Sequence, residues 1–316
     1  MNKKITAIIL ALCLSACATG LIGCKRVVDS GKPRVALVMK SLANEFFKTM
    51  EDGAKGHHKA NSAEYELVTV GIRDELDVAQ QIKLVESMIA QQVNAIVIAP
   101  ADSIALIPVC KKAIQAGITV VNIDNKFDDE ILASRDVKIP FVGPDNRKGA
   151  TLAGDYLAKK LTKGDKVAII EGAPNAFNAI QRKLGFEDAM KRAGMNIVSS
   201  QTAYWETDRA NKVASAMIVA EPQLKAILCA NDSMVIGALA AVKAAGKTGD
   251  ILTVGFDNIA AVQRALKEGR ILCTVDQHAD KLAVFGIEYA LEMLSKGGTP
   301  KDRETAVDLI TAEKLK

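Results

Sequence analysis

Polar and aromatic side chains recur directly after the predicted strands of this 316-residue chain. In chain order they are Lys40, Asn44, Phe46, Phe47, Asp124, Asn125, Trp205, Asn231, Asp232, Asp257, Asn258, Asp276 and Gln277. In open parallel sheets, ligands bind beyond the carboxyl ends of the strands. The spacing of these residues therefore predicts one site to which many strand ends contribute.

The residue types match what a polyhydroxylated ligand requires. Carboxylates, amides and cationic side chains offer acceptors and donors to hydroxyl groups, which need both at once, and aromatic rings pack against the C–H face of a sugar. The alternative for Asp124, Asn231 and Asp257 is that each is a helix N-cap after a strand. For Lys40 the alternative is a solvated strand end, and for Trp205 it is ordinary core packing. Recurrence at six strand ends favours a binding site.

Short β-branched runs alternate with helical stretches from residue 33 onward. The predicted strands are 35–39, 66–70, 95–99, 119–123, 141–143, 167–171, 197–202, 226–229, 251–254 and 272–275. The predicted helices between them include 77–91, 148–161, 179–193, 211–220, 234–245 and 281–295. Such repeats predict parallel sheets with helices on both faces. Because ten strands exceed an ordinary open sheet of about six, we expect an α/β fold of two doubly wound lobes joined by a hinge.

The composition supports this fold and excludes several functions. Hydrophobic residues make up 49% of the chain but aromatic residues only 4%, so the core is built from aliphatic side chains. The net charge of +4 is mild and scattered, which is not the pattern of a nucleic-acid surface. Cys110, Cys229 and Cys273 are widely spaced among apolar neighbours, which indicates buried thiols and not a disulfide framework. The chain has no CxxC pattern and three histidines, so we expect no metal and no cofactor.

The first two dozen residues predict export. Two lysines precede an apolar run at 5–14, and small residues follow, which is the pattern of a secretory signal and is too short for a membrane-spanning helix. Leu21-Ile22-Gly23-Cys24 resembles the bacterial lipobox, whose cysteine receives a lipid and becomes the mature N-terminus. Cys17 is the alternative anchor, and a cleaved signal without lipid is the other alternative. Cys24 is favoured because a polar tether begins at Lys25.

Six short motifs, in order, resemble the ribose- and allose-binding members of the periplasmic sugar-binding family, which deliver sugars to ATP-binding-cassette (ABC) importers. They are Leu42 to Phe47 with Asp52-Gly53-Ala54, Val121 to Asp124, Gly172 to Arg182, Ala230-Asn231-Asp232, Val254 to Asp257 and Thr274 to Gln277. The resemblance covers nearly the whole mature chain and implies the type I periplasmic binding fold. The domains expected on it are a signal peptide at 1–23, a tether at 24–33, an N-terminal lobe at 34–144 and 278–308, and a C-terminal lobe at 145–277 and 309–316.

The resemblance also implies roles for individual residues. The positions that match residues bonding sugar hydroxyls are Asn44, Asp124, Arg182, Asn231, Asp257 and Gln277. Phe46, Phe47 and Trp205 match stacking positions, and Lys40 matches a lysine of the allose-binding members. The implied partners are a monosaccharide and the permease subunits of an ABC transporter, with the protein itself a monomer held at the membrane only through its lipid.

Two departures from the ribose-binding pattern bear on the ligand. Asn125 stands where those members have an arginine, which leaves room for a larger ring, so we expect a hexose or ketose. Glu45 stands where ribose- and allose-binding members have proline, which loosens the loop or adds a carboxylate near the rim. The segment 176–178 also differs, so Phe177 or Asn178 could add contacts.

Three other functions are compatible with parts of this pattern. Catalysis by Asp124 and Asp257 would need a set separation and a raised pKa, and no GxSxG, HExxH or Gly-rich phosphate loop is present. A repressor would need a DNA-binding helix-turn-helix ahead of the first strand, where the signal peptide is predicted. A sensor accessory that presents its ligand to a membrane receptor stays open, because the docking partner is determined by the lobe surfaces and not by the pocket.

Overall fold

The computed structural model describes residues 31–315. The predicted signal peptide and the two candidate lipidation sites, Cys17 and Cys24, lie outside the described residues. Among the described residues, no helix combines the length and apolarity needed to cross a membrane.

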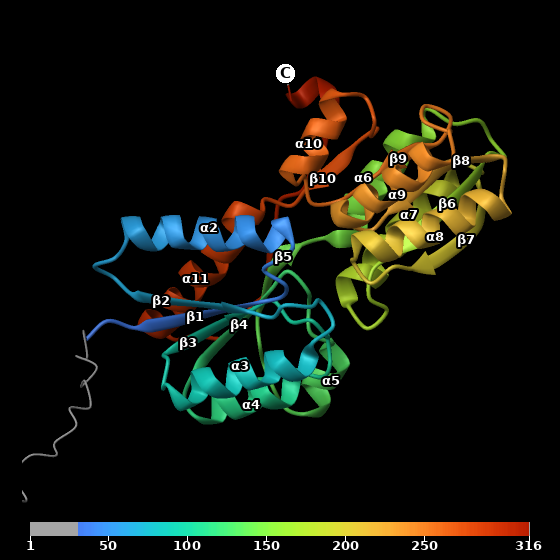
Figure 1. The fold of residues 1–316 in the computed structure, drawn as a ribbon. Coiled ribbons are helices and arrows are strands. Elements are labelled where there is room, and N and C mark those ends of the chain that lie inside the picture. The colour runs from blue at the N-terminus through green and yellow to red at the C-terminus, as the bar shows by residue number, and fades with distance from the viewer. Residues whose placement is uncertain (1–30, 316) are drawn as a thin grey trace, which may run out of the picture. The chain divides into compact units, whose positions relative to one another are not determined.

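The first sheet holds six parallel strands in the order β11-β5-β4-β3-β1-β2. They are β1 (Arg34–Met39), β2 (Glu66–Gly71), β3 (Ala95–Ile98), β4 (Thr119–Ile123), β5 (Phe141–Pro144) and β11 (Arg303–Thr305). One face is covered by α2 (Glu45–Ala60) and α11 (Ala279–Lys296), the other by α3 (Val78–Ala90) and α4 (Ile107–Gln115), and α5 (Asp129–Ser134) follows β4 (Figure 1).

Strand β1 shows why these strands are continuously apolar. Val35 and Leu37 pack into the core on the α2 side, whereas Ala36 and Val38 pack into the core on the α3 side. Successive side chains of a strand point to opposite faces, and both faces of this sheet are covered. Every position of the strand therefore needs an apolar residue.

The second sheet repeats the pattern with four parallel strands in the order β7-β6-β8-β9. They are β6 (Lys166–Glu171), β7 (Asn196–Thr202), β8 (Leu224–Cys229) and β9 (Leu252–Val254). Their helices are α6 (Asn146–Ala158), α7 (Phe177–Arg192), α8 (Thr207–Ala220), α9 (Asp232–Ala244) and α10 (Ala260–Lys267) (Figure 1). In both sheets the second strand lies beside the first and the third lies on its other side. Each lobe thus has a reversal of strand order, at β1/β3 and at β6/β8, where ligands bind in such folds.

The chain connects the lobes through short segments. It leaves the first sheet after β5, returns through α11 after β10 (Thr274–Asp276), and passes from β11 to β12 (Asp308–Ile310), which pairs antiparallel with β10. A short 3-10 helix, η1 (Ala312–Leu315), follows. The prediction of an α/β fold with two doubly wound lobes is confirmed.

All ten predicted strands are present, with ends that differ by one or two residues. The short strands β11 and β12 were missed. Each has three residues without an apolar run, and each forms only because its partner strand, distant in sequence, presents a free edge. Local pattern carries no signal of such pairing.

Candidate functional site

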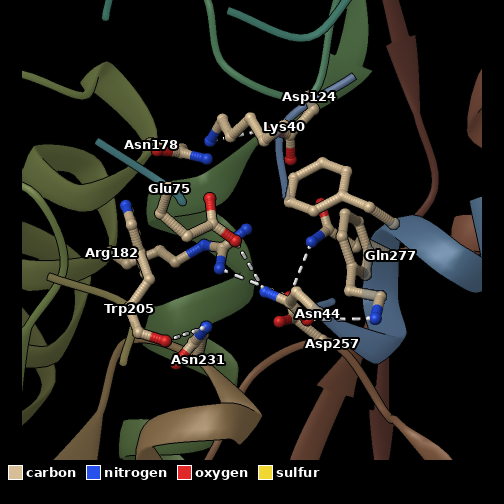
Figure 2. Close-up of a pocket in the computed structure, with 12 residues that line it drawn as sticks. Lys40, Asn44, Glu75, Asp124, Asn178, Arg182, Trp205, Asn231, Asp257 and Gln277 are labelled. Carbon is tan, nitrogen blue, oxygen red and sulfur yellow. Dashed lines mark hydrogen bonds and ion pairs between the residues drawn. The ribbon is translucent and has the colours of Figure 1, made fainter. Parts of the chain in front are cut away.

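One small cavity lies where strand ends of the two lobes meet (Figure 2). Its lining residues are Lys40, Asn44, Phe46, Phe47, Glu75, Asp124, Asn178, Arg182, Trp205, Asn231, Asp257 and Gln277. Ten of the eleven ligand-binding residues proposed from the sequence are therefore brought together around one small space.

A buried ion pair forms the first-lobe side of the cavity. Lys40, at the end of β1, places its Nζ atom 3.1 Å from Oδ2 of Asp124, at the end of β4. Both side chains are at most 4% exposed, so Lys40 is not a solvated strand end. A buried charge is tolerated only where an opposite charge neutralises it, and the pair leaves further donors and acceptors for a ligand.

On the second-lobe side of the cavity, Arg182 and Asp257 form another buried ion pair. The Arg182 guanidinium on α7 donates from Nε to Asn146 Oδ1 (2.8 Å) and from Nη1 to the Ala230 carbonyl (2.9 Å), with Asp257 Oδ1 at 3.4 Å. Gln277 Nε2 donates to the same Asp257 oxygen at 2.8 Å. Burial raises the pKa of Asp257, while Arg182 and the Gln277 hydrogen bond oppose that rise. These contacts hold Asp257 in one orientation.

Aromatic rings close the apolar sides. Phe46 and Phe47, in the first turn of α2, pack edge to face with ring centres 5.1 Å apart. The centre of the Trp205 ring lies 5.7 Å from both Lys40 Nζ and Arg182 Cζ, so the ring makes cation–π contacts with a charged group of each lobe. A Cβ atom on Gly172 would lie 2.1 Å from the indole, so only glycine allows this ring position.

The N-cap alternative applies to some of these residues and not to others. Asn44 caps α2 by accepting from Phe46 N, and Asn231 caps α9 by accepting from Met234 N. Both also line the cavity, where Asn44 Nδ2 donates to Glu75 Oε1 at 2.9 Å and Asn231 Nδ2 donates to the Trp205 carbonyl at 3.4 Å. Asp124 and Asp257 are not caps, because α5 and α10 begin at other residues.

Backbone conformation also marks the site. Asp124, Trp205 and Asp257 have positive φ angles of 61°, 71° and 123°, a region that side chains other than glycine rarely adopt. Such strain persists where surrounding structure enforces it, and it clusters at binding sites. All three residues line the cavity.

Three buried oxygens of the lining residues have acceptor capacity left: Asn178 Oδ1 and Gln277 Oε1 accept no hydrogen bond from any described residue, and Asp124 Oδ2 has only its ion pair with Lys40. Buried polar atoms are normally paired, and an unpaired acceptor is costly. The three come from the first lobe, the second lobe and the segment after β10. A ligand with several hydroxyl donors would satisfy all of them at once.

Sequence reasoning missed Glu75 and left Asn178 unplaced, whereas Phe177 does not line the cavity. Glu75 lies in the loop after β2, four residues beyond the strand end, so inspection of only the adjacent residues passed over it. Because ligands bind beyond the carboxyl ends of parallel strands, the polar residues of the whole loop after β2 were candidates, and these include Glu75. Burial raises the pKa of Glu75 to about 7, against the lowering effects of Lys40 and Asn44.

Asn125 does not line the cavity, contrary to the prediction. Its Nδ2 donates to the Pro100 carbonyl at 2.9 Å, and its Oδ1 accepts from Ser103 Oγ at 3.3 Å and from Asn178 N at 3.2 Å. Asp124, in its left-handed conformation, occupies the position facing the cavity, and the next side chain is directed away. The inference of a larger ring from Asn125 therefore loses its structural basis.

Other residues near strand ends serve the fold. Asp232 is fully buried, accepting from Thr274 Oγ1 at 2.8 Å and from Ile259 N at 3.1 Å. Glu45 lies outside the cavity, and its Oε1 accepts from Ala260 N at 2.7 Å. The carboxylate expected near the rim is present and contacts the other lobe.

The sequence and fold were compared with known proteins. The model of the periplasmic binding protein domain matches residues 35–299. The chain is 55% identical over 308 residues to the D-ribose/D-allose-binding protein of Pseudomonas aeruginosa, covering 96% of both chains.

Two solved structures share the fold. One is an ABC transporter solute binding protein from Burkholderia multivorans, with a TM-score of 0.87 and 57% identity over 89% of this chain and 100% of the other. The second is a periplasmic solute binding protein from Actinobacillus succinogenes with bound D-allose, with a TM-score of 0.85 and 36% identity over 90% of this chain and 99% of the other. The relatives are binding proteins of transport systems and not enzymes. The resemblance drawn from the sequence is confirmed: the chain belongs to the periplasmic binding protein family, among the sugar-binding members that serve ABC transporters.

Proposed function

We propose that this protein binds D-allose, and D-ribose as a second ligand, and hands the sugar to an ABC importer when its lobes close. The observation that carries the proposal is the set of three acceptors inside one cavity with aromatic walls: Asn178 Oδ1 and Gln277 Oε1, which are unpaired, and Asp124 Oδ2, which is paired only with Lys40. Hydroxyl groups donate to such acceptors while their own oxygens accept from Lys40, Arg182 and the amides.

The choice of sugar rests on stereochemistry and on a relative. As pyranoses, D-allose and D-ribose share the configuration of C2 to C4, and allose adds a hydroxymethyl group at C5. A site that holds the shared ring therefore accepts both. The protein from Pseudomonas aeruginosa that shares 55% of its residues is named for both sugars. The hexose expected from the sequence is kept, now as allose.

Sugar binding should favour the closed form because the contacting residues come from both lobes. A ligand shifts a two-state equilibrium only through its preference for one state. Because Asp124 belongs to the first lobe and Asn178 and Arg182 to the second, both sets reach one ring only when the lobes are together. In this role no residue acts as a catalyst: Asp124 and Asp257 are held by Lys40 and Arg182 as fixed acceptors.

Titration calorimetry with D-allose, D-ribose, D-allulose, D-galactose, D-fructose and D-glucose tests this proposal. Glucose, the C3 epimer of allose, should bind at least about 100-fold more weakly, because one hydroxyl would leave its partner unpaired. Binding of glucose as tight as allose, or no binding of any of these sugars, would contradict the assignment.

The remaining expectations form part of the same proposal. We infer a monomer tethered by lipid at Cys24, with lobes at 34–144 plus 278–308 and at 145–277 plus 309–316. The strands of the first sheet fall within the first set, and β6 to β9 within the second, which supports these limits.

A further inference from the structure

Three helices of the second lobe, α7, α8 and α10, begin without a side-chain cap of their own, and two of them, α7 and α10, face the first lobe. The N-cap residues of α7 and α10 are Ala176 and Ile259, and neither side chain accepts a hydrogen bond from its helix. The first N–H groups of a helix have no partner within it, so a cap, water or another group must satisfy them.

Side chains of the first lobe supply those caps. At α7, Ser103 Oγ accepts from Phe177 N at 2.9 Å, and Asn125 Oδ1 accepts from Asn178 N at 3.2 Å. At α10, the Glu45 carboxylate accepts from Ala260 N at 2.7 Å. A carboxylate at a helix N-terminus gains further from the helix dipole.

These capping residues do not touch the ligand cavity. Glu45, Ser103 and Asn125 are all absent from its lining. Ser103 is 5% exposed and Asn125 is fully buried in the closed arrangement, so separation of the lobes would uncover both them and the N–H groups they cap. The three capping hydrogen bonds, from Phe177 N, Asn178 N and Ala260 N, exist only while the lobes are together.

We propose that Glu45, Ser103 and Asn125 form an interlobe latch, in which first-lobe side chains cap α7 and α10 and thereby set the closure equilibrium. The latch rests on the proposed function, since it assumes that sugar binds the closed form. Apparent affinity is the intrinsic affinity multiplied by the closed fraction. The latch therefore scales the affinity of every sugar by one factor, unlike a contact residue, which changes the ratio between sugars.

The test compares Glu45→Ala and Ser103→Ala with the unchanged protein by calorimetry, using D-allose and D-ribose. Loss of an N-cap interaction corresponds to a change of about 3- to 30-fold in an equilibrium constant. Each variant should weaken both sugars by the same factor in this range. The factors should multiply in the double variant, because the two caps contact different helices.

Asp77→Ala is the matched control. Asp77 caps α3 within the first lobe by accepting from Gln80 N at 2.9 Å. Its loss should lower the melting temperature but leave both dissociation constants within twofold. Glu45→Gln keeps the acceptor oxygen and removes the charge, so this variant should retain much of the sugar affinity. Salt should weaken sugar binding less in Glu45→Gln than in the unchanged protein, because the charge that salt screens is gone.

Small-angle X-ray scattering separates failure of the latch from failure of the proposed function. Without sugar, Glu45→Ala should have a larger radius of gyration than the unchanged protein, and this result needs no ligand. The latch is refuted if neither variant alters this radius or the affinities, if the allose-to-ribose ratio changes, or if Asp77→Ala weakens binding equally. Failure of all sugars to bind the unchanged protein would refute the ligand assignment, and the scattering comparison would still decide the latch.

Discussion

At the scale of single residues, the cavity is organised by pairing its charges. Lys40 with Asp124 and Arg182 with Asp257 place two cations and two carboxylates around one small space, each buried with an opposite partner. Breaking such a pair is costly because it leaves a charge without compensation. The ring hydroxyls would add to these pairs and not replace them.

Asp257→Ala should lower sugar affinity by about 30- to 1000-fold, because hydroxyls that donate to this carboxylate would be left unpaired and Arg182 would lose its partner. Titration calorimetry on protein with unchanged circular dichroism measures the loss. Asp145→Ala, which removes the N-cap of α6, is the control and should bind normally. Unchanged affinity in Asp257→Ala would show that this carboxylate has only a structural role.

Glu75→Gln should stabilise the protein above neutral pH. Burial raises the pKa of Glu75 from 4.5 to about 7 in the folded state. Between these values the folded protein binds more protons than the unfolded chain, so the contribution of Glu75 to stability falls as pH rises, and is fully unfavourable above about 7. Glutamine mimics the neutral form and avoids this loss, which is on the order of 3 kcal/mol for this rise in pKa.

Thermal unfolding checks the prediction. The melting temperature of Glu75→Gln should exceed that of the unchanged protein by about 2 to 6 °C at pH 8, and the gain should disappear near pH 4.5. Glu64→Gln, at an exposed position, should show no such dependence on pH. An equal loss of stability at both pH values would mean that the ionised carboxylate is favoured in the fold.

At the scale of elements, the ends of strands position the site. Gly172 directly follows β6, and the Trp205 indole packs so closely on it that a Cβ atom at this position would overlap the ring. The stacking wall therefore depends on the residue at a strand end as well as on the aromatic side chain itself.

Gly172→Ala should displace Trp205 and weaken sugar binding by about 10- to 100-fold, the effect expected of overpacking a fitted contact. Trp205 is the only tryptophan of the chain, so its fluorescence reports the displacement directly. Gly56→Ala, where a Cβ atom meets no atom within 4 Å, should change neither signal. Normal fluorescence and affinity in Gly172→Ala would show that the indole can move without loss.

At the scale of the whole molecule, a sugar-binding protein that serves an ABC transporter acts beside that transporter in the membrane. We expect a diacylglyceryl group on Cys24, because a polar tether follows it in the sequence. Mass spectrometry of the membrane fraction measures it. A lipid on Cys17, or an unmodified protein released in soluble form, would contradict this, and Cys24→Ala should abolish membrane retention.

The fold and most of the site could be predicted from the sequence because both depend on local pattern. Alternating apolar strands and helices indicated two doubly wound lobes, and polar and aromatic residues after the strands nominated nine of the cavity's lining residues. The tenth, Arg182, was nominated only by the resemblance to the sugar-binding family. Parallel strands bring their carboxyl ends to the same edge, so neighbours of strand ends converge without knowledge of the loops.

The direction of each side chain was decided only by the tertiary structure. Asn125 is adjacent to Asp124 yet lies behind the cavity, because the left-handed turn at Asp124 directs one side chain inward and the next toward Ser103. Glu75 reaches the cavity from a loop whose path the pattern does not determine. The caps on α7 and α10 come from residues distant in the chain, and only packing of the two lobes against each other brings donor and acceptor together.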